Sequence, residues 1–186
     1  MLDIIRLIGS IFYPLVEGIR IIGVLIGITA LSSTEIGLEN PRFFEDNRGN
    51  LIFSFNLKNT FNDKFQRLVE RGITSGYAID VSFQTTKILV NVSITNKVTY
   101  NNSKNMFLVH LHKNATTKSI TINSIEEVKT VMNQINILLP KSGIEGEEVT
   151  VRIKAEPFFE YQEFSDIDPS RAVWGRKLSV EIKYRL

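Results

Sequence analysis

From about residue 40 onward, apolar and polar residues alternate one by one in several separate stretches of the chain. The clearest stretches are residues 51–57, 77–84 and 178–186. A period of two places the apolar side chains on one face of a β-strand, whereas a helix needs a repeat near 3.6. The alternation therefore restricts this part of the chain to a β-rich fold.

Turn-forming residues divide this region into strands. Phe43 and Phe44 precede a turn at residues 46–49, where Gly49 supplies the positive φ that a hairpin needs. Residues 51–57 form the return strand of this hairpin. Further strands are expected at residues 77–84, 88–94, 106–112, 120–122, 149–155 and 178–186.

Two stretches have the helical repeat instead. Asn59 or Thr60 can cap the first helix, which ends near Gly72. Ser124 and Glu127 form a capping box at the start of the second helix, which Pro140 ends. The expected apolar stripes are Phe61, Phe65, Leu68 and Val69 in the first helix, and Ile125, Val128, Met132, Ile135 and Leu139 in the second.

Residues 1–34 differ from the rest because they hold long aliphatic runs with few charged residues. We interpret them as a membrane anchor, although the uncharged run of residues 21–34 is shorter than the roughly 20 residues of a straight span. A span then also uses apolar residues before Arg20, whose side chain extends to the interface. A signal peptide cleaved at Ala30-Leu31-Ser32 and a buried helix of a cytosolic domain are the alternatives.

The anchor and the signal peptide predict the same location for the rest of the chain. Arg6 and Arg20 precede the last apolar run, and the positive-inside rule keeps such residues in the cytoplasm. We therefore expect a single span in a bacterial cytoplasmic membrane. Residues 36–186 then form an exported domain on the periplasmic or outer face.

Composition excludes several functional classes. The chain of 186 residues is 43% hydrophobic, which is too apolar for a disordered protein, and its net charge of +2 gives no support for binding nucleic acid. It has no cysteine, which excludes disulfides, thiolate metal sites and cysteine nucleophiles. The partners we expect are the membrane, through residues 1–34, and another envelope protein.

The sequence contains little that points to catalysis. Its two histidines, His110 and His112, lie two apart on one strand face, and such a pair holds a metal only with further ligands. The chain has no H-E-x-x-H, G-x-S-x-G or phosphate-loop motif. We therefore expect no catalytic residue, no metal and no cofactor, and we do not expect an enzyme.

Aromatic residues gather in residues 157–175, which we expect to be an irregular loop. Aromatic side chains outside regular strands either plug one end of a sheet or form a patch that binds a partner. Both interpretations stay open here. The candidate partner-binding residues are Phe158, Phe159, Tyr161, Phe164 and Trp174.

The order of these features resembles a family of bacterial exported proteins, domain-of-unknown-function family 4390. The resemblance lies in the opening apolar segment, residues 46–57 and residues 65–73, and most specifically in residues 100–109, 124–128 and 147–153. It covers residues 36–186. The resemblance implies an envelope location and an unassigned role, with no catalytic residues to carry over.

We expect an α+β domain of mostly antiparallel, sandwich-like sheet with two helices covering one side, preceded by an N-terminal hydrophobic helix. The function expected first is a non-enzymatic interaction or accessory module of the cell envelope. The second is an envelope module that binds a small hydrophobic or lipid ligand, because a sheet covered by helices can open an apolar pocket.

Overall fold

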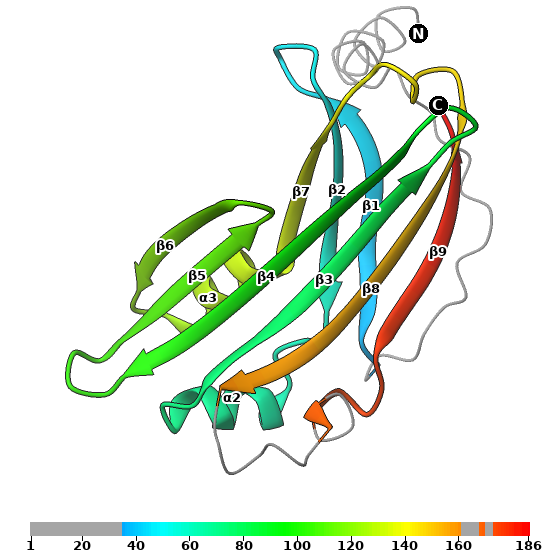
Figure 1. Cartoon of the computed structure of the whole chain (residues 1–186). Coiled ribbons are helices and arrows are strands. Elements are labelled where there is room, and N and C mark those ends of the chain that lie inside the picture. Colours follow the sequence, from blue (N-terminus) through cyan, green and yellow to red (C-terminus); the bar gives the residue numbers. More distant parts are fainter. Residues whose placement is uncertain (1–34, 161–167, 170–172) are drawn as a thin grey trace, which may run out of the picture.

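Two antiparallel β-sheets pack face to face in the computed structural model, which describes residues 35–160, 168–169 and 173–186 (Figure 1). The expected N-terminal hydrophobic helix and the candidate residues Tyr161 and Phe164 lie outside the described residues. The elements are β1 (Gly37–Glu45), β2 (Leu51–Lys58), α2 (Asp63–Glu70), β3 (Thr74–Gln84), β4 (Leu89–Asn101), β5 (Met106–Lys113), β6 (Thr116–Ile122), α3 (Ile125–Asn133), β7 (Gln134–Leu139), β8 (Glu148–Glu160) and β9 (Leu178–Arg185).

The smaller sheet has the strand order β1-β2-β7 and begins with the expected hairpin. The Asp46 carboxylate accepts hydrogen bonds from the Asn50 side chain at 2.9 Å and from the backbone of Asn50 and Arg48, each at 2.8 Å, and these bonds lower its pKa. Gly49 has a φ of 73°, as the turn requires. The four residues of β2 that were expected to face inward, Leu51, Phe53, Phe55 and Leu57, are all buried, so the predicted hairpin and its inward face are confirmed.

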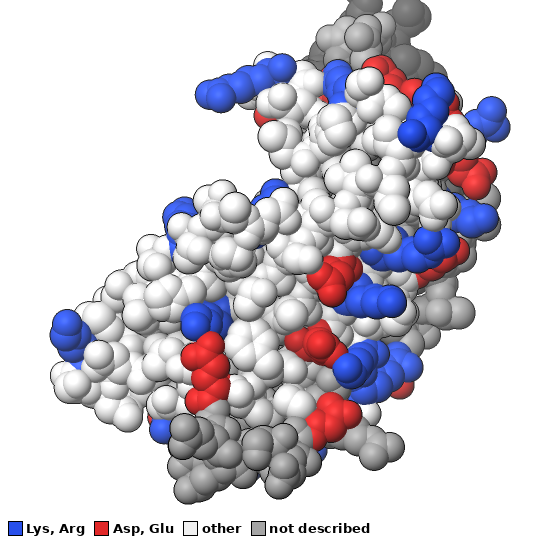
Figure 2. All heavy atoms as spheres, viewed as in Figure 1, with Lys and Arg blue, Asp and Glu red and all other residues white. Residues whose placement is uncertain are grey.

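The larger sheet has the order β6-β5-β4-β3-β8-β9, and every neighbouring pair of strands is antiparallel. One face of this sheet packs on the smaller sheet and the helices, and the other is solvated. Figure 2 shows the solvated face, where acidic and basic side chains alternate over β8 and β9. Arg152 on β8, for example, lies 2.6 Å from Glu181 on β9. The expected class, mostly antiparallel sheet with two helices, is confirmed for this part.

An aromatic cluster joins the two sheets. Phe53 of β2 lies between Phe43 of β1 and Phe83 of β3, with ring centroids 4.8 Å and 5.3 Å away. Tyr184 of β9 contacts Phe43 at 5.0 Å, and its hydroxyl donates to the carbonyl oxygen of Pro41 at 2.8 Å. Because these rings come from four strands of both sheets, they hold the faces of the sandwich together.

Helix α2 starts later than expected. Asn62, not Asn59 or Thr60, is its N-cap, and the Asn62 side chain accepts from the backbone N–H of Phe65 at 3.0 Å. Asn59 has a φ of 59°, which no α-helix contains, so the helix begins after this residue. The end of the helix is as expected, with Gly72 at a φ of 79°.

The second helix is shorter than the sequence predicted, with nine residues. Helix α3 ends at Asn133, and residues 134–139 form strand β7, which pairs with β2. Ile135, Ile137 and Leu139 are buried there, while Gln134, Asn136 and Leu138 between them are exposed. The expected helix from Ser124 to Pro140 is therefore wrong beyond residue 133, because these six residues alternate with period two and lie beside an unpaired edge of β2. Ser124 is the N-cap but makes no capping hydrogen bond through its side chain, so the expected capping box is also absent.

Candidate functional site

The aromatic residues near the end of β8 do not lie in an irregular loop as expected. Strand β8 continues to Glu160, so Phe158 pairs with Gly76 and Phe159 with Ser75 on β3. Neighbouring residues of a strand face opposite sides, and Phe159 packs against the core while Phe158 lies over the outer face. A Cβ at Gly76 would come within 2.6 Å of Phe158 Cζ, so the missing side chain makes room for this ring.

Trp174 lies in the core, with 7% of its surface exposed. Its indole N–H donates to the carbonyl oxygen of Thr60 at 3.0 Å, and its ring lies 5.8 Å from that of Tyr77. Phe158, Phe159 and Trp174 therefore do not share one surface. The role of the five candidate residues in binding a partner stays a prediction.

A buried polar network lies next to Trp174. The hydroxyls of Thr60 and Tyr77 both donate to Asn133 Oδ1, each at 2.6 Å, and the side chain of Asn96 donates to the carbonyl oxygen of Met132 at 2.7 Å. Burial raises the pKa of Tyr77 well above its ordinary value, so this hydroxyl stays protonated. The network joins the end of α3 to β3, β4 and the segment before α2, and it acts as a structural clamp.

The two histidines face solvent on the outer face of the β5–β6 hairpin. His110 Nδ1 lies 2.9 Å from Ser119 Oγ, and His112 Nδ1 lies 2.7 Å from Thr117 Oγ1. Among the described residues, no group of three histidine, aspartate or glutamate side chains is placed to hold a metal ion. The histidines are part of a polar ladder between two strands.

An open cleft of about 540 Å³ lies where the two sheets separate. Four elements contribute apolar side chains to its wall: Ile94 of β4, Leu111 of β5, Val131 of α3 and Ile135 of β7. In Figure 2 the molecule is hollowed at the upper left, above the lobe that β5 and β6 form in Figure 1. A second hollow of about 390 Å³ near Asn133 is lined by polar residues alone, so the first is better suited to bind a partner.

Within the described part of the chain no strand pairs with the outer edge of β7, and this free edge forms one side of the cleft. In an antiparallel pair of strands, every second pair of opposite residues is hydrogen-bonded through the backbone. Asp46 and Asn50 are such a pair at the β1–β2 turn, so Phe44 and Ile52 are the next one. The backbone N–H and C=O of Phe53 therefore face β7 and pair with Ile137. The backbone groups of Asn136 and Leu138 consequently point away from β2, and Asn136 lines the cleft.

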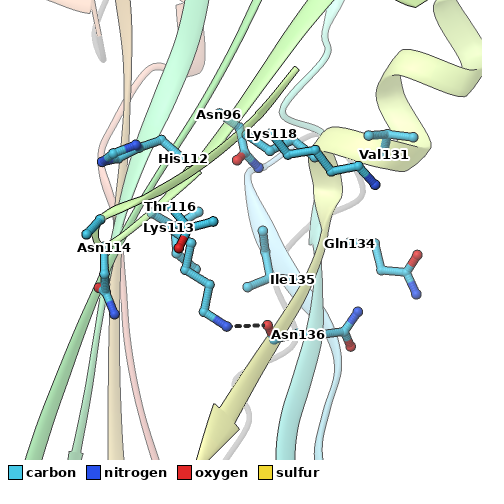
Figure 3. Close-up of a pocket in the computed structure, with 13 residues that line it drawn as sticks. Asn96, His112, Lys113, Asn114, Thr116, Lys118, Val131, Gln134, Ile135 and Asn136 are labelled. Atoms are coloured by element: carbon cyan, nitrogen blue, oxygen red, sulfur yellow. Dashed lines mark hydrogen bonds between the residues drawn. The ribbon is translucent and has the colours of Figure 1, made fainter. Parts of the chain in front are cut away.

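Lys113 crosses the cleft from β5 to this edge. Its ammonium donates to the carbonyl oxygen of Asn136 at 3.0 Å, as Figure 3 shows. Burial lowers the pKa of Lys113. Lys118 of β6 extends toward Val131 and Gln134, while the ring of His112 points away from Ile135 (Figure 3).

No family model matches this chain, and neither a curated protein nor a solved structure matches it. The resemblance to domain-of-unknown-function family 4390 stays a prediction. No helix in the described part of the chain is long and apolar enough to cross a membrane.

Neither the cleft nor the β7 edge was predicted from the sequence. The available signal was the alternation of Gln134 to Leu139, which competes with the helical repeat over the same residues. No sequence pattern marked Lys113 and Lys118 as residues of one cleft, because the register of the β5–β6 hairpin decides that both side chains face the same side.

Proposed function

We propose that this chain is a non-enzymatic interaction module of the bacterial cell envelope, anchored in the cytoplasmic membrane by residues 1–34. In this proposal an extended segment of another envelope protein adds to the free edge of β7. The observation that carries it is that, within the described residues, no strand pairs with the outward-facing backbone of Asn136 and Leu138, and that Asn136 lines an open cleft. Such an edge binds peptides through main-chain hydrogen bonds.

The exposed side chain of Leu138 supports this use of the edge. It is 59% exposed, whereas the other exposed residues of this strand, Gln134 and Asn136, are polar. Two of the other edge strands differ: β1 has an irregular register between Glu39 and Arg42, and the exposed residues of β9 include Glu181, Lys183 and Arg185. Bulges and charges of this kind protect edges from pairing, and β7 has neither.

The test uses the full chain in cells, with a photoreactive residue in place of Asn136. We expect a crosslink to one envelope protein that disappears when Leu138→Pro is added, because proline removes a donor on the free edge and is tolerated on edge strands. Thr121→Pro on the free edge of β6 is the matched control and keeps the crosslink. A crosslink that survives Leu138→Pro, or one that forms equally from Ser179 on the outer face, would overturn the proposal.

A lipid-binding module is the second candidate, because the cleft has an apolar wall of suitable size. It predicts that lipid co-purifies with the full chain in native mass spectrometry. Replacing Leu111 with Asp would then remove the lipid, whereas Leu138→Pro would keep it.

A further inference from the structure

We infer that the segment that adds to β7 is acidic, with carboxylates on alternate residues that face Lys113 and Lys118. This inference rests on the proposed function and specifies the chemistry of the partner.

The register places both lysines on the wall that an added strand would face. Ile135, Ile137 and Leu139 of β7 point into the sandwich, and a strand beside β7 would turn every second side chain the same way. That direction leads to the inner face of β5 and β6, where Lys118 is paired with Leu111 and Lys113 ends the strand.

The charge of the cleft is one-sided. Among the described residues that line it there are two lysines and no aspartate or glutamate. Within the same part of the chain, neither lysine has an ion-pair partner, whereas Lys87 lies 2.6 Å from Glu147 and Lys141 lies 2.8 Å from Glu45. An apolar wall with unpaired cations is complementary to a segment that brings its own carboxylates.

Lys113 also occupies a position that an added strand would use. Its bond to the carbonyl oxygen of Asn136 takes an acceptor to which the N–H of a partner strand would donate. A partner segment would displace the ammonium, which would then lie within the cleft beside the incoming side chains. A carboxylate at that place offers the displaced ammonium a stronger hydrogen bond than the neutral carbonyl it leaves.

The competing explanation is that inward-pointing lysines only protect the β6 edge from pairing, as such charges do in many sheets. That explanation predicts no preference for acidic segments. It also predicts that removing the lysines makes copies of the chain associate with one another.

The experiment measures binding of a capped, fluorescent hexapeptide of alternating glutamate and threonine to the full chain in nonionic detergent. A matched peptide of alternating lysine and threonine is the control. We expect the glutamate peptide to bind at least about tenfold more tightly, to lose about tenfold in affinity with Lys113→Gln plus Lys118→Gln, and to bind more weakly with Leu138→Asp than with Leu138→Lys. Hydrogen exchange should slow at Asn136 and Leu138.

Three results would overturn the inference: equal affinity for the two peptides, protection at β6 instead of β7, or dimers of the variant with Lys113→Gln plus Lys118→Gln in sedimentation. If the crosslink from Asn136 forms in cells while the glutamate peptide has no advantage, the acidic partner is wrong and the interaction module stands. If no crosslink forms from Asn136, the proposed function itself fails.

Discussion

The ammonium of Lys113 lies 3.0 Å from the carbonyl oxygen of Asn136 and so joins the two sheets across the open side of the sandwich. A half-buried cation that bonds only to a neutral oxygen is partly desolvated without full compensation, which lowers its pKa from 10.5. The charged form of Lys113 is therefore less favourable in the folded chain than in the unfolded one.

The first prediction concerns pH. The unfolded chain holds the Lys113 proton more tightly, so the stability of the wild type should rise relative to Lys113→Met as pH increases from the lowered pKa toward 10.5. Between pH 6 and 8 the difference should be constant and within about 1 kcal/mol. Chemical denaturation of both proteins from pH 6 to pH 10.5 measures the difference in the free energy of unfolding. A wild type that loses stability relative to the variant as pH rises would contradict the prediction.

The second prediction concerns the strand that replaces the second half of the expected helix. Ile137 is fully buried, so Ile137→Asp should unfold the domain, whereas Leu138→Asp at an exposed position should change the free energy of unfolding by less than about 0.5 kcal/mol. Thermal melting followed by circular dichroism compares the two variants. A helix over residues 125–139 would place Ile137 off the apolar stripe, so a mild effect there would refute β7.

The third prediction concerns the buried hydroxyls. Tyr77→Phe leaves Asn133 Oδ1 with its bond from Thr60 and should cost about 1 to 2 kcal/mol. Asn133→Leu leaves two buried donors without an acceptor and should cost more. Ser93→Ala, which removes an exposed bond to Asp80, is the control and should be nearly neutral. If Asn133→Leu were as mild as the control, the network would not act as a clamp.

The fourth prediction concerns Gly76 under the ring of Phe158. A Cβ at this position would overlap the carbonyl oxygen of Asn96, so Gly76→Ala should lower stability by about 2 kcal/mol or more. Phe158→Ala alone should be milder, because this ring is partly exposed on the outer face. Since the overlap with the backbone remains, Phe158→Ala should not rescue Gly76→Ala, and urea unfolding of the double variant tests this.

The fifth prediction concerns location. A reporter that works only outside the cytoplasm should be active when fused after Leu186, because Arg6 and Arg20 precede the last apolar run of the N-terminal segment. The same fusion without residues 1–34 is the control and should be inactive, because the reporter stays in the cytoplasm. An inactive full-length fusion would refute the envelope location.

Local alternation was sufficient to predict most strands and their buried faces. Phe53 and Phe55, or Val151 and Ile153, point inward because a strand presents alternate residues to one side and only one side of each sheet is covered. Gly49 and Gly72 marked a turn and a helix end because both positions need a positive φ. These features depend on residues close together in the chain.

The end of the second helix depends on residues far apart. Ile135 and Leu139 fit a helical stripe with Val128 and Met132, and they fit a strand equally well with Ile137 between them. Strand pairing prevails because Phe53 and Phe55 of β2 otherwise have an unpaired edge, and β7 satisfies their backbone groups while burying three apolar side chains.

The sequence by itself determined that the chain is β-rich, which side chains face inward and where the tight turns lie, since neighbouring residues carry these properties. Only the tertiary structure decided that β7 is a strand with one free edge, that Phe158 and Phe159 lie on opposite faces, and that Lys113 and Lys118 share a cleft with Ile94 and Ile135. The physical reason is that the cleft exists where two twisted sheets diverge, and no local pattern records which strands will border it.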